Sequence, residues 1–316
     1  MKRLDVLSIG ETLIDLISDT EQASLADSRR FIMYPGGAVT NVALNVARLG
    51  GSSALVASVG DDALGMFLRD HLASAGVETT YVCIAQQLPT TLAVVARHHA
   101  TPDFTIYRGA DAYIVPENLP LAILPTTTLV HTSAFALSRE PSCSTVLAFI
   151  AQAHAAGCLV SFDPNYHPRL WETSADPLEM FASICPYVFL MKPSLDDCMR
   201  LFGGGQTPEE YAARFLALGV QQVVLTMGRG GVLLANAAGM SYHATRQIDV
   251  VDVTGAGDSF WAGLLLAILD GYPTSEALRV GQAVAEIKLQ QVGPLAQGID
   301  RLQLYASLGL TSPEVS

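Results

Sequence analysis

The sequence predicts an α/β fold of three layers, in which a mostly parallel central sheet is covered by helices on both faces. Two observations support this class. Uninterrupted apolar segments, typical of strands that are buried on both faces, alternate along the chain with stretches of helical periodicity. Several helical stretches also end in glycine, which is common just after a helix C-terminus. Strands that alternate with helices form parallel sheets between two helix layers.

The elements of the predicted central sheet follow one another over most of the chain. Strands are expected at residues 5–9, 53–59, 128–132, 158–162, 188–191 and 222–226. Helices are expected at residues 39–49, 66–75, 144–155 and 208–218, and they end at Gly50, Gly76, Gly157 and Gly219. A further apolar run at residues 260–269 is long enough for a buried helix. In such sheets, ligands bind beyond the carboxyl ends of the strands.

Two pairs of predicted strands interrupt this alternation because no helix separates their members. The first pair is formed by residues 12–18 and 30–34, and the second by residues 90–98 and 104–108. The second pair flanks a turn at Ala100-Thr101-Pro102-Asp103. From their pattern alone, both pairs could be ordinary hairpins at the edge of a sheet.

The charge and hydropathy of the chain exclude some classes of partner. With 18 basic and 30 acidic residues the net charge is −12, and there is no basic run to bind nucleic acid or an anionic membrane. No apolar stretch approaches the length of a membrane span. The short apolar run before Gly10 fits a first buried strand better than a signal peptide, so we expect a cytoplasmic protein.

The most informative segment is Gly255-Ala256-Gly257-Asp258, at the start of the apolar run. Small residues leave backbone N–H groups uncovered at a helix N-terminus, which attracts anions. A carboxylate at such a site is explained if Asp258 removes a proton from an alcohol that attacks a bound phosphoryl group. The alternative is a plain glycine turn in which Asp258 stabilises its own helix.

Two other classes of nucleotide site do not fit the sequence. The three lysines are Lys2, Lys192 and Lys288, and none completes the Gly-x-x-x-x-Gly-Lys pattern of a P-loop. Phosphate must then be held mainly by backbone N–H groups. The glycines at residues 226–231 have the wrong spacing for a dinucleotide fold and precede a predicted strand, so they could also form a hairpin turn.

Several motifs together resemble the ribokinase-like sugar kinases, or phosphofructokinase B family, and most closely its fructokinases. In order, they are Asp15, Pro35-Gly36-Gly37-Ala38 with Asn41, Gly60-Asp61-Asp62, Asp163-Pro164-Asn165-Tyr166, Thr226-Met227-Gly228, and Asp252 and Thr254 before Gly255-Ala256-Gly257-Asp258. The resemblance covers nearly the whole chain and implies one kinase domain over residues 1–316. It also implies a small β-sheet lid over the sugar, built from residues 11–35 and 88–112, through which a homodimer forms.

The resemblance implies ATP-dependent phosphorylation of a primary hydroxyl of a sugar. Asp258 would be the general base, and the backbone of Gly255, Ala256 and Gly257 would form the anion hole. A carboxylate inside an apolar strand needs a partner, and the resemblance supplies sugar hydroxyls for Asp15. The implied sugar-binding residues are Asp15, Gly36, Gly37, Asn41, Arg108, Asp163 and Asn165.

The resemblance also assigns residues to ATP and to metal ions. The implied ATP-binding residues are Lys192, Ser194, Thr226, Gly228, Gly231 and Gln282. Asp197 would help to organise Mg²⁺, while Asp252 and Thr254 would contribute to a site for a monovalent cation such as K⁺. Ser194 and Asp197 stand where the family has Asn-x-x-Glu, and Ser194 could equally be a helix N-cap.

The sugar itself is left open by the sequence. Residues 35–38 and 108–111 favour fructose, while 2-keto-3-deoxygluconate kinases and nucleoside kinases of the same family are alternatives. A nucleotide- or sugar-binding regulator without catalysis is the alternative from another class, and the presence of Asp258 argues against it.

Overall fold

The computed structural model describes residues 3–97, 103–171, 176–291, 295 and 298–310. Within them, nine strands form a main sheet in the order β13-β12-β11-β10-β9-β8-β1-β4-β5. All neighbours from β11 to β5 run parallel, and β12 and β13 extend one edge as an antiparallel meander. The strands are β1 (Leu4–Ile9), β4 (Ser53–Gly60), β5 (Val82–Ala85), β8 (Thr127–Ser133), β9 (Leu159–Asp163), β10 (Leu190–Met191), β11 (Gln222–Thr226), β12 (Val232–Asn236) and β13 (Gly239–His243).

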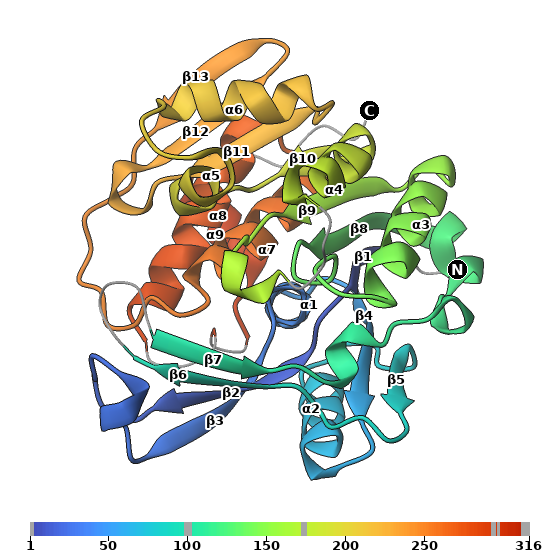
Figure 1. The fold of residues 1–316 in the computed structure, drawn as a ribbon. Coiled ribbons are helices and arrows are strands. Elements are labelled where there is room, and N and C mark those ends of the chain that lie inside the picture. Colours follow the sequence, from blue (N-terminus) through green and yellow to red (C-terminus); the bar gives the residue numbers. More distant parts are fainter. Residues whose placement is uncertain (1–2, 98–102, 172–175, 292–294, 296–297, 311–316) are drawn as a thin grey trace.

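Helices cover both faces of the main sheet (Figure 1). Alternate residues of the strands point to opposite layers, so Val6 and Val224 pack in one apolar cluster, and Leu7 and Val223 pack in another. One layer contains α1 (Ala38–Arg48), α2 (Ala63–Ser74), α7 (Ala256–Leu269), α8 (Thr274–Leu289) and α9 (Arg301–Ser307). The other contains α3 (Ser142–Ala155), α4 (Pro177–Ile184), α5 (Leu195–Phe202) and α6 (Pro208–Ala217). Among the helices of the described ranges, none is long and apolar enough to cross a membrane.

A second, smaller sheet lies beside the main body, at the bottom of Figure 1. Its order is β3-β2-β6-β7, with two antiparallel pairs joined by a parallel contact between β2 and β6. The turn expected at Ala100-Thr101-Pro102-Asp103 falls mostly outside the described residues, which resume at Asp103. The four strands are β2 (Leu13–Ser18), β3 (Phe31–Gly36), β6 (Leu92–Ala96) and β7 (Asp103–Tyr107). The two strand pairs therefore form a separate sheet and not hairpins at the edge of the main one.

The three-layer α/β class is confirmed, and the expected elements lie within a few residues of their predicted bounds. The glycines that follow α1, α2, α3 and α6 have φ angles between 76° and 106°, a range that side chains disfavour. The strands β5 and β13 were not predicted. Only two of the four residues in β5 are buried and none in β13 is, so neither carries the apolar run that marks a strand of this sheet.

Helix α7 is fixed to the sheet by a buried hydrogen-bond chain. The indole Nε1 of Trp261 donates to Ser161 Oγ on β9 at 2.8 Å, and that oxygen lies 3.0 Å from His131 Nδ1 on β8. Burial lowers the pKa of His131 to about 3, with the nearby charge of Lys192 adding to the effect, so the imidazole is neutral. The Ser161 hydroxyl can then accept from Trp261 and donate to His131. This chain holds the helix that begins with the Gly255-Ala256-Gly257-Asp258 segment.

We predict that Ser161→Ala lowers the free energy of unfolding by about 1–3 kcal/mol, because it leaves buried groups of Trp261 and His131 without a partner. Urea denaturation measures the change. Ser58→Ala is the matched control, since Ser58 is also buried in a central strand but its hydroxyl has no hydrogen-bond partner among the described residues. Equal losses in the two variants would contradict the role given to Ser161.

Candidate active site

The N-terminus of α7 is an open group of backbone donors. Gly255 precedes the helix with φ 71° and ψ 7°, the left-handed conformation that favours glycine, and no side chain caps the helix there. A Cβ at Gly257 would meet only Lys192 Nζ, at 3.7 Å, within 4 Å. The first N–H groups of the helix therefore carry partial positive charge and are not covered by side chains of their own segment.

Asp258 lies in the first turn of α7 and faces helix α1. Asn41 of α1 donates from Nδ2 to Asp258 Oδ2 at 2.8 Å, and one turn further on Asn45 donates to Ser259 Oγ at 3.2 Å. Burial raises the pKa of Asp258 to about 6, while Lys192 opposes the rise and Asp163 adds to it. The carboxylate is therefore ionised at neutral pH and becomes protonated as the pH falls through about 6.

A buried ion pair lies beneath this turn. Lys192 follows β10 and Asp163 ends β9, so the parallel strands bring them together, with Lys192 Nζ 2.7 Å from Asp163 Oδ2. Both side chains are buried. Burial alone would lower the pKa of Lys192, but Asp163 and then Asp258 raise it above its ordinary value. A permanent positive charge thus lies next to the uncovered N–H groups of α7.

Ser194 and Asp197 form a capping box at the start of α5. Asp197 Oδ2 accepts from the backbone N and the hydroxyl of Ser194, at 2.9 and 2.6 Å, and Ser194 Oγ accepts from Asp197 N at 3.1 Å. Asp197 Oδ1 accepts from Tyr166 N at 2.8 Å. Burial, followed by the charge of Asp163, raises the pKa of Asp197 to about 6. The N-cap interpretation of Ser194 is confirmed, and both oxygens of Asp197 already have protein partners.

Asp15 reaches the site from the small sheet. Its pKa is raised to about 7, first by burial and then by the negative charge of Asp258, so the two carboxylates interact. Gly36 on β3, diagonally across from Asp15 in the strand register, leaves space for it, because a Cβ there would overlap the Asp15 carboxylate. Gly37 has φ 103° and would place a Cβ 2.6 Å from the carbonyl oxygen of Glu11. Gly36 is therefore required by the space that Asp15 occupies, and Gly37 by its positive φ and its close approach to Glu11.

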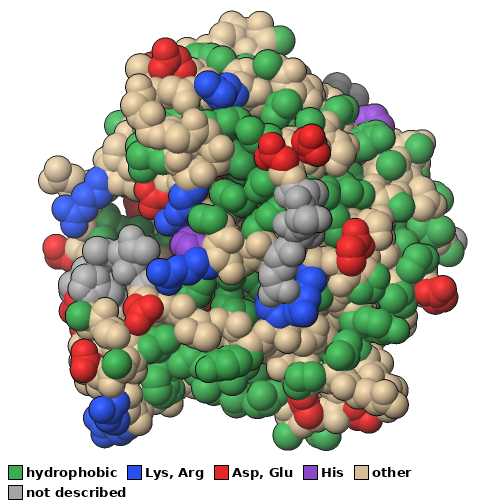
Figure 2. Space-filling view, in the orientation of Figure 1, with side chains coloured by type: hydrophobic (Ala, Val, Ile, Leu, Met, Phe, Trp, Pro, Cys, Tyr) green, Lys and Arg blue, Asp and Glu red, His purple; other side chains and the backbone are tan. Residues whose placement is uncertain are grey.

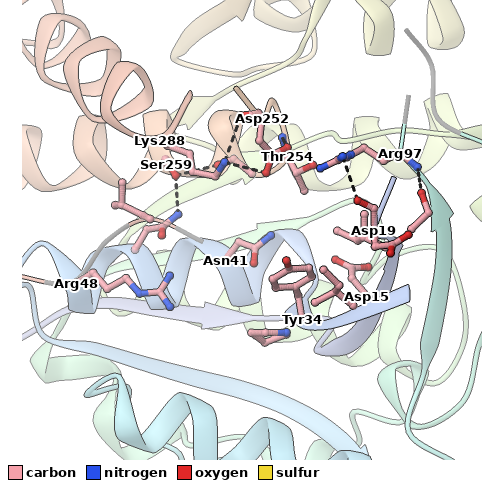
Figure 3. Close-up of a pocket in the computed structure, with 17 residues that line it drawn as sticks. Asp15, Asp19, Tyr34, Asn41, Arg48, Arg97, Asp252, Thr254, Ser259 and Lys288 are labelled. Carbon is pink, nitrogen blue, oxygen red and sulfur yellow. Dashed lines mark hydrogen bonds and ion pairs between the residues drawn. The ribbon is translucent and has the colours of Figure 1, made fainter. Parts of the chain in front are cut away.

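A cavity of about 150 Å³ separates the small sheet from α1 and α7. Figure 3 shows Asp15 and Tyr34 on the side of the small sheet, opposite Asp252, Thr254 and Lys288. Five of the residues that the sequence singled out line this cavity: Asp15, Asn41, Asp252, Thr254 and Gly255. Eight other polar residues of its wall were missed: Ser18, Asp19, Tyr34, Asn45, Arg48, Arg97, Ser259 and Lys288.

Arg108 is held away from the cavity wall by other protein groups. Its Nε and Nη2 contact Asp111 Oδ2 at 2.7 and 2.6 Å, and Nη1 donates to Ser138 Oγ at 3.0 Å. The guanidinium also stacks 4.0 Å from the centroid of the Phe135 ring. With a side chain that is 5% exposed, Arg108 braces the end of β7 rather than reaching into the cavity.

The other predicted residues lie at or after the ends of strands of the main sheet or, in the case of Gln282, on helix α8. Thr226 ends β11 and is bridged to Ser194, while Gly228 and Gly231 have φ angles of 55° and 89° in the tight turn between the antiparallel β11 and β12. The hairpin interpretation of these glycines is thus confirmed. Gln282 on α8 donates to Ala244 O at 3.0 Å. Asn165 is exposed with φ 35°, and its backbone N donates to Asp163 Oδ1 at 3.1 Å.

Glu11 is a structural residue of the site that belongs to the motifs of the family resemblance but was given no role from the sequence. It is buried at the end of β1, where Oε1 accepts from Ala38 N at 2.8 Å and Oε2 accepts from Ser133 Oγ at 2.9 Å. Burial raises the pKa of Glu11 to about 7. The carboxyl group caps α1 across 27 residues of chain. The one available signal was a carboxylate directly after an apolar strand.

Comparisons with known proteins agree with this arrangement. The pfkB family of carbohydrate kinases matches residues 3–299. An ATP-dependent 6-phosphofructokinase of Thermoanaerobacterium thermosaccharolyticum is 37% identical over 294 residues, which cover 93% of this chain and 90% of the relative.

Two solved structures share the fold. A fructokinase of Halothermothrix orenii superposes with a TM-score of 0.80 at 35% identity, over 89% of this chain and 98% of its own. An uncharacterized sugar kinase of Pyrococcus horikoshii, solved in complex with ATP, superposes with a TM-score of 0.81 at 28% identity, over 95% of this chain and 97% of its own. Because the family match spans both sheets and the α7 segment, the chain belongs to the pfkB family of carbohydrate kinases.

Proposed function

We propose that this ATP-dependent sugar kinase phosphorylates a primary hydroxyl of fructose, with Asp258 as the general base. The observation that carries the proposal is the position of Asp258 in the first turn of α7, where Asn41, a residue of the same cavity wall as Asp15, donates to it at 2.8 Å. A base beside an anion site, with a second carboxylate opposite, suits an alcohol held between a sugar site and a phosphoryl group.

In the proposed reaction, Asp258 accepts the proton of the sugar hydroxyl while that oxygen attacks the γ-phosphorus of ATP. The new P–O bond forms as the bond to the ADP leaving group breaks. The N–H groups of Gly255 and Gly257 stabilise the negative charge on the transferring group, joined by that of Ala256 once it is released from its 3.2 Å hydrogen bond to Val253 O. The buried ammonium of Lys192 adds a positive charge beside them. The raised pKa of Asp258, about 6, makes it a better proton acceptor than an ordinary aspartate and still leaves it ionised at neutral pH.

Mg²⁺ fits this site as part of the nucleotide rather than as a resident ion. No group of three histidine, cysteine or carboxylate side chains in the described ranges is arranged to hold a metal. Asp163 and Asp197 are nevertheless close to Lys192, so two carboxylates surround one ammonium. Mg²⁺ commonly keeps several waters and binds through phosphates and one or two carboxylates. We infer that Asp163 and Asp197 would orient such waters, and that the ion would supply positive charge to the phosphates.

Sugar binding is assigned to the side of the cavity formed by the small sheet. Asp15 would accept hydrogen bonds from sugar hydroxyls, and Asn41, which lines the same cavity, connects this wall to Asp258 through the hydrogen bond from its Nδ2. The fructokinase of Halothermothrix orenii supports fructose as the acceptor. In this proposal Gly36 and Gly37 admit the sugar, while Arg108 acts indirectly by holding the strand end.

Fructose 6-phosphate is a second candidate, favoured by Arg97. This residue follows β6 and lines the same cavity as Asp15, where its Nη2 donates to the carbonyl of Asp19 at 3.3 Å. Within the described residues this is its one guanidinium contact, which is weak and neutral and leaves the group able to bind a phosphate. The relative from Thermoanaerobacterium thermosaccharolyticum bears the name 6-phosphofructokinase.

The small sheet also supports the proposal of a homodimer. Large hydrophobic side chains that remain exposed on its edge strands are Ile32 and Met33 of β3 and Tyr107 of β7. Figure 2 shows hydrophobic side chains over this part of the surface. These residues lie on the two opposite edges of the small sheet, and exposed apolar groups on a sheet edge are a common site of association. Sedimentation as a monomer at micromolar concentration would refute a stable dimer.

A substrate panel separates the sugar candidates. Fructose, fructose 6-phosphate, 2-keto-3-deoxygluconate and nucleosides are compared by ADP formation. We expect the highest kcat/KM with fructose, and Arg97→Met should then leave it nearly unchanged. If fructose 6-phosphate is the better substrate and Arg97→Met raises its KM selectively, the second candidate replaces the first. Preference for a nucleoside would contradict both.

We predict that Asp258→Asn lowers kcat by about 10²–10⁴-fold, the usual contribution of a general base, with little change in the KM for ATP. Steady-state kinetics with the preferred sugar measure both constants. Asp196→Asn is the matched control, because Asp196 also lies in the first turn of a helix but is exposed. A rate near that of the wild type in Asp258→Asn would exclude Asp258 as the base.

We predict that Asp15→Ala raises the KM for sugar by about 10- to 150-fold, since a hydrogen bond to a charged group contributes about 1.5–3 kcal/mol. The KM for ATP should stay close to the wild-type value. Asp27→Ala, in an exposed part of the connection between β2 and β3, controls for charge removal from this region. If the KM for ATP changes instead, Asp15 does not bind the sugar.

A further inference from the structure

Lys288 places a buried ammonium beside the segment that leads into α7. It lies in the last turn of α8 and is 1% exposed, which is rare for a lysine. Its Nζ is 3.3 Å from Asp252 O, 3.4 Å from Asp252 Oδ2 and 3.4 Å from Gln291 O. Two carbonyls and one carboxylate oxygen therefore face a single positive charge. The proposed phosphoryl transfer gives Lys288 no role.

The contacts of Lys288 connect α8 to the start of the anion site. The backbone N atoms of Val251 and Asp252 donate to Leu289 O, at 2.8 and 3.3 Å, and Asp252 Oδ1 accepts from Thr254 N at 3.0 Å. Gly255 follows directly, and α7 begins at Ala256. In Figure 3, Lys288 reaches toward Asp252, with Thr254 next to it on the same wall. The position of this segment therefore depends on charge supplied by Lys288.

The same oxygens were expected to contribute to a K⁺ site, because the family resemblance assigned Asp252 and Thr254 to a monovalent cation. K⁺ does not fit at Asp252 as the structure stands. The main-chain oxygen and one carboxylate oxygen of Asp252 already contact an ammonium, which carries the charge of K⁺ and also binds oxygen ligands. A metal ion that shared these oxygens would be repelled by Lys288 at short range.

We propose that the Lys288 ammonium is a built-in monovalent cation that replaces K⁺ in positioning the Asp252–Thr254 segment and the N-terminus of α7. Lys288 is a positioning residue in this account, because it acts on the anion site through the backbone. Activity should then not depend on K⁺ or Na⁺. The inference rests on the proposed kinase activity, but it is independent of which sugar is the acceptor.

The first experiment uses the wild-type protein and the best substrate of the panel. K⁺ and Na⁺ are replaced by choline at constant ionic strength, with Mg²⁺ and ATP kept saturating. We expect the same kcat and the same melting temperature in KCl and in choline chloride. A kcat that falls severalfold without K⁺ would overturn the proposal, whatever the behaviour of any variant.

The second experiment removes the ammonium. Lys288→Ser leaves the oxygens of Asp252 and Gln291 without a cation, and we expect kcat in choline chloride to fall by about 10–100-fold, the effect of a small misplacement of catalytic groups. KCl should restore part of this loss and raise the melting temperature of Lys288→Ser, because an ion that binds only the folded state stabilises it. Neither effect of K⁺ should occur in the wild type.

Arg279→Met is the control, since it removes an exposed positive charge from the same helix without touching Asp252. It should behave as the wild type in both salts. A Lys288→Ser variant with the wild-type kcat and no response to K⁺ would overturn the role of Lys288. The melting temperatures can be measured without turnover. If the protein phosphorylates no sugar, the proposed function is refuted, but the effect of K⁺ on the melting temperature of Lys288→Ser still tests the cation proposal.

Discussion

The buried pair of Lys192 and Asp163 is the interaction on which the charged part of this structure depends. Asp258 and Asp197 both lie near this pair. Burial raises the pKa of both carboxyl groups, and no opposite charge would limit the rise if Lys192 were absent. A single ammonium held at 2.7 Å from Asp163 counters this effect and keeps negative charge tolerable in the interior. Because the pair sits where β9 and β10 end, the parallel order of the sheet determines where this charge lies. The ammonium of this pair, rather than the pair as a whole, is the positive group beside the donors of α7, in a chain that is strongly acidic overall.

Features that depend on local sequence could be predicted, while those that depend on distant partners could not. The alternation of apolar strands and helices gave the three-layer class, and glycines with positive φ marked the helix ends. The Gly255–Asp258 segment was recognised because its conformation and its charge are both local. Glu11, by contrast, is defined by hydrogen bonds to α1 and to Ser133, 122 residues away. In the sequence, Lys288 has the pattern of an ordinary helical lysine, and only the fold brings Asp252 close to it. The pairing of Arg108 with Asp111, three residues later, could not be predicted because an exposed arginine has the same sequence context.

Helix α1 links the two halves of the candidate site. Its N-terminus continues from β3 of the small sheet through Gly36 and Gly37, and is capped by Glu11 at the end of β1. Its polar side contacts α7 twice, through Asn41 and Asn45. The small sheet is thus connected through α1 to the hydrogen bond between Asn41 and Asp258. We infer that the geometry of the carboxylate at α7 is coupled to the position of the small sheet through this one helix.

The interaction between Asp15 and Asp258 has a thermodynamic consequence for ligand binding. With a pKa raised to about 7, Asp15 holds a proton in a large fraction of the empty molecules at neutral pH. A sugar hydroxyl that donates to Asp15 favours its ionised form, so we infer that binding expels this proton into solution. The heat of sugar binding would then contain the protonation enthalpy of the buffer, and titration calorimetry in phosphate and in Tris would give different apparent enthalpies. Identical enthalpies in both buffers would mean that Asp15 keeps its protonation state, and that recognition of the acceptor involves no exchange of protons with the solvent.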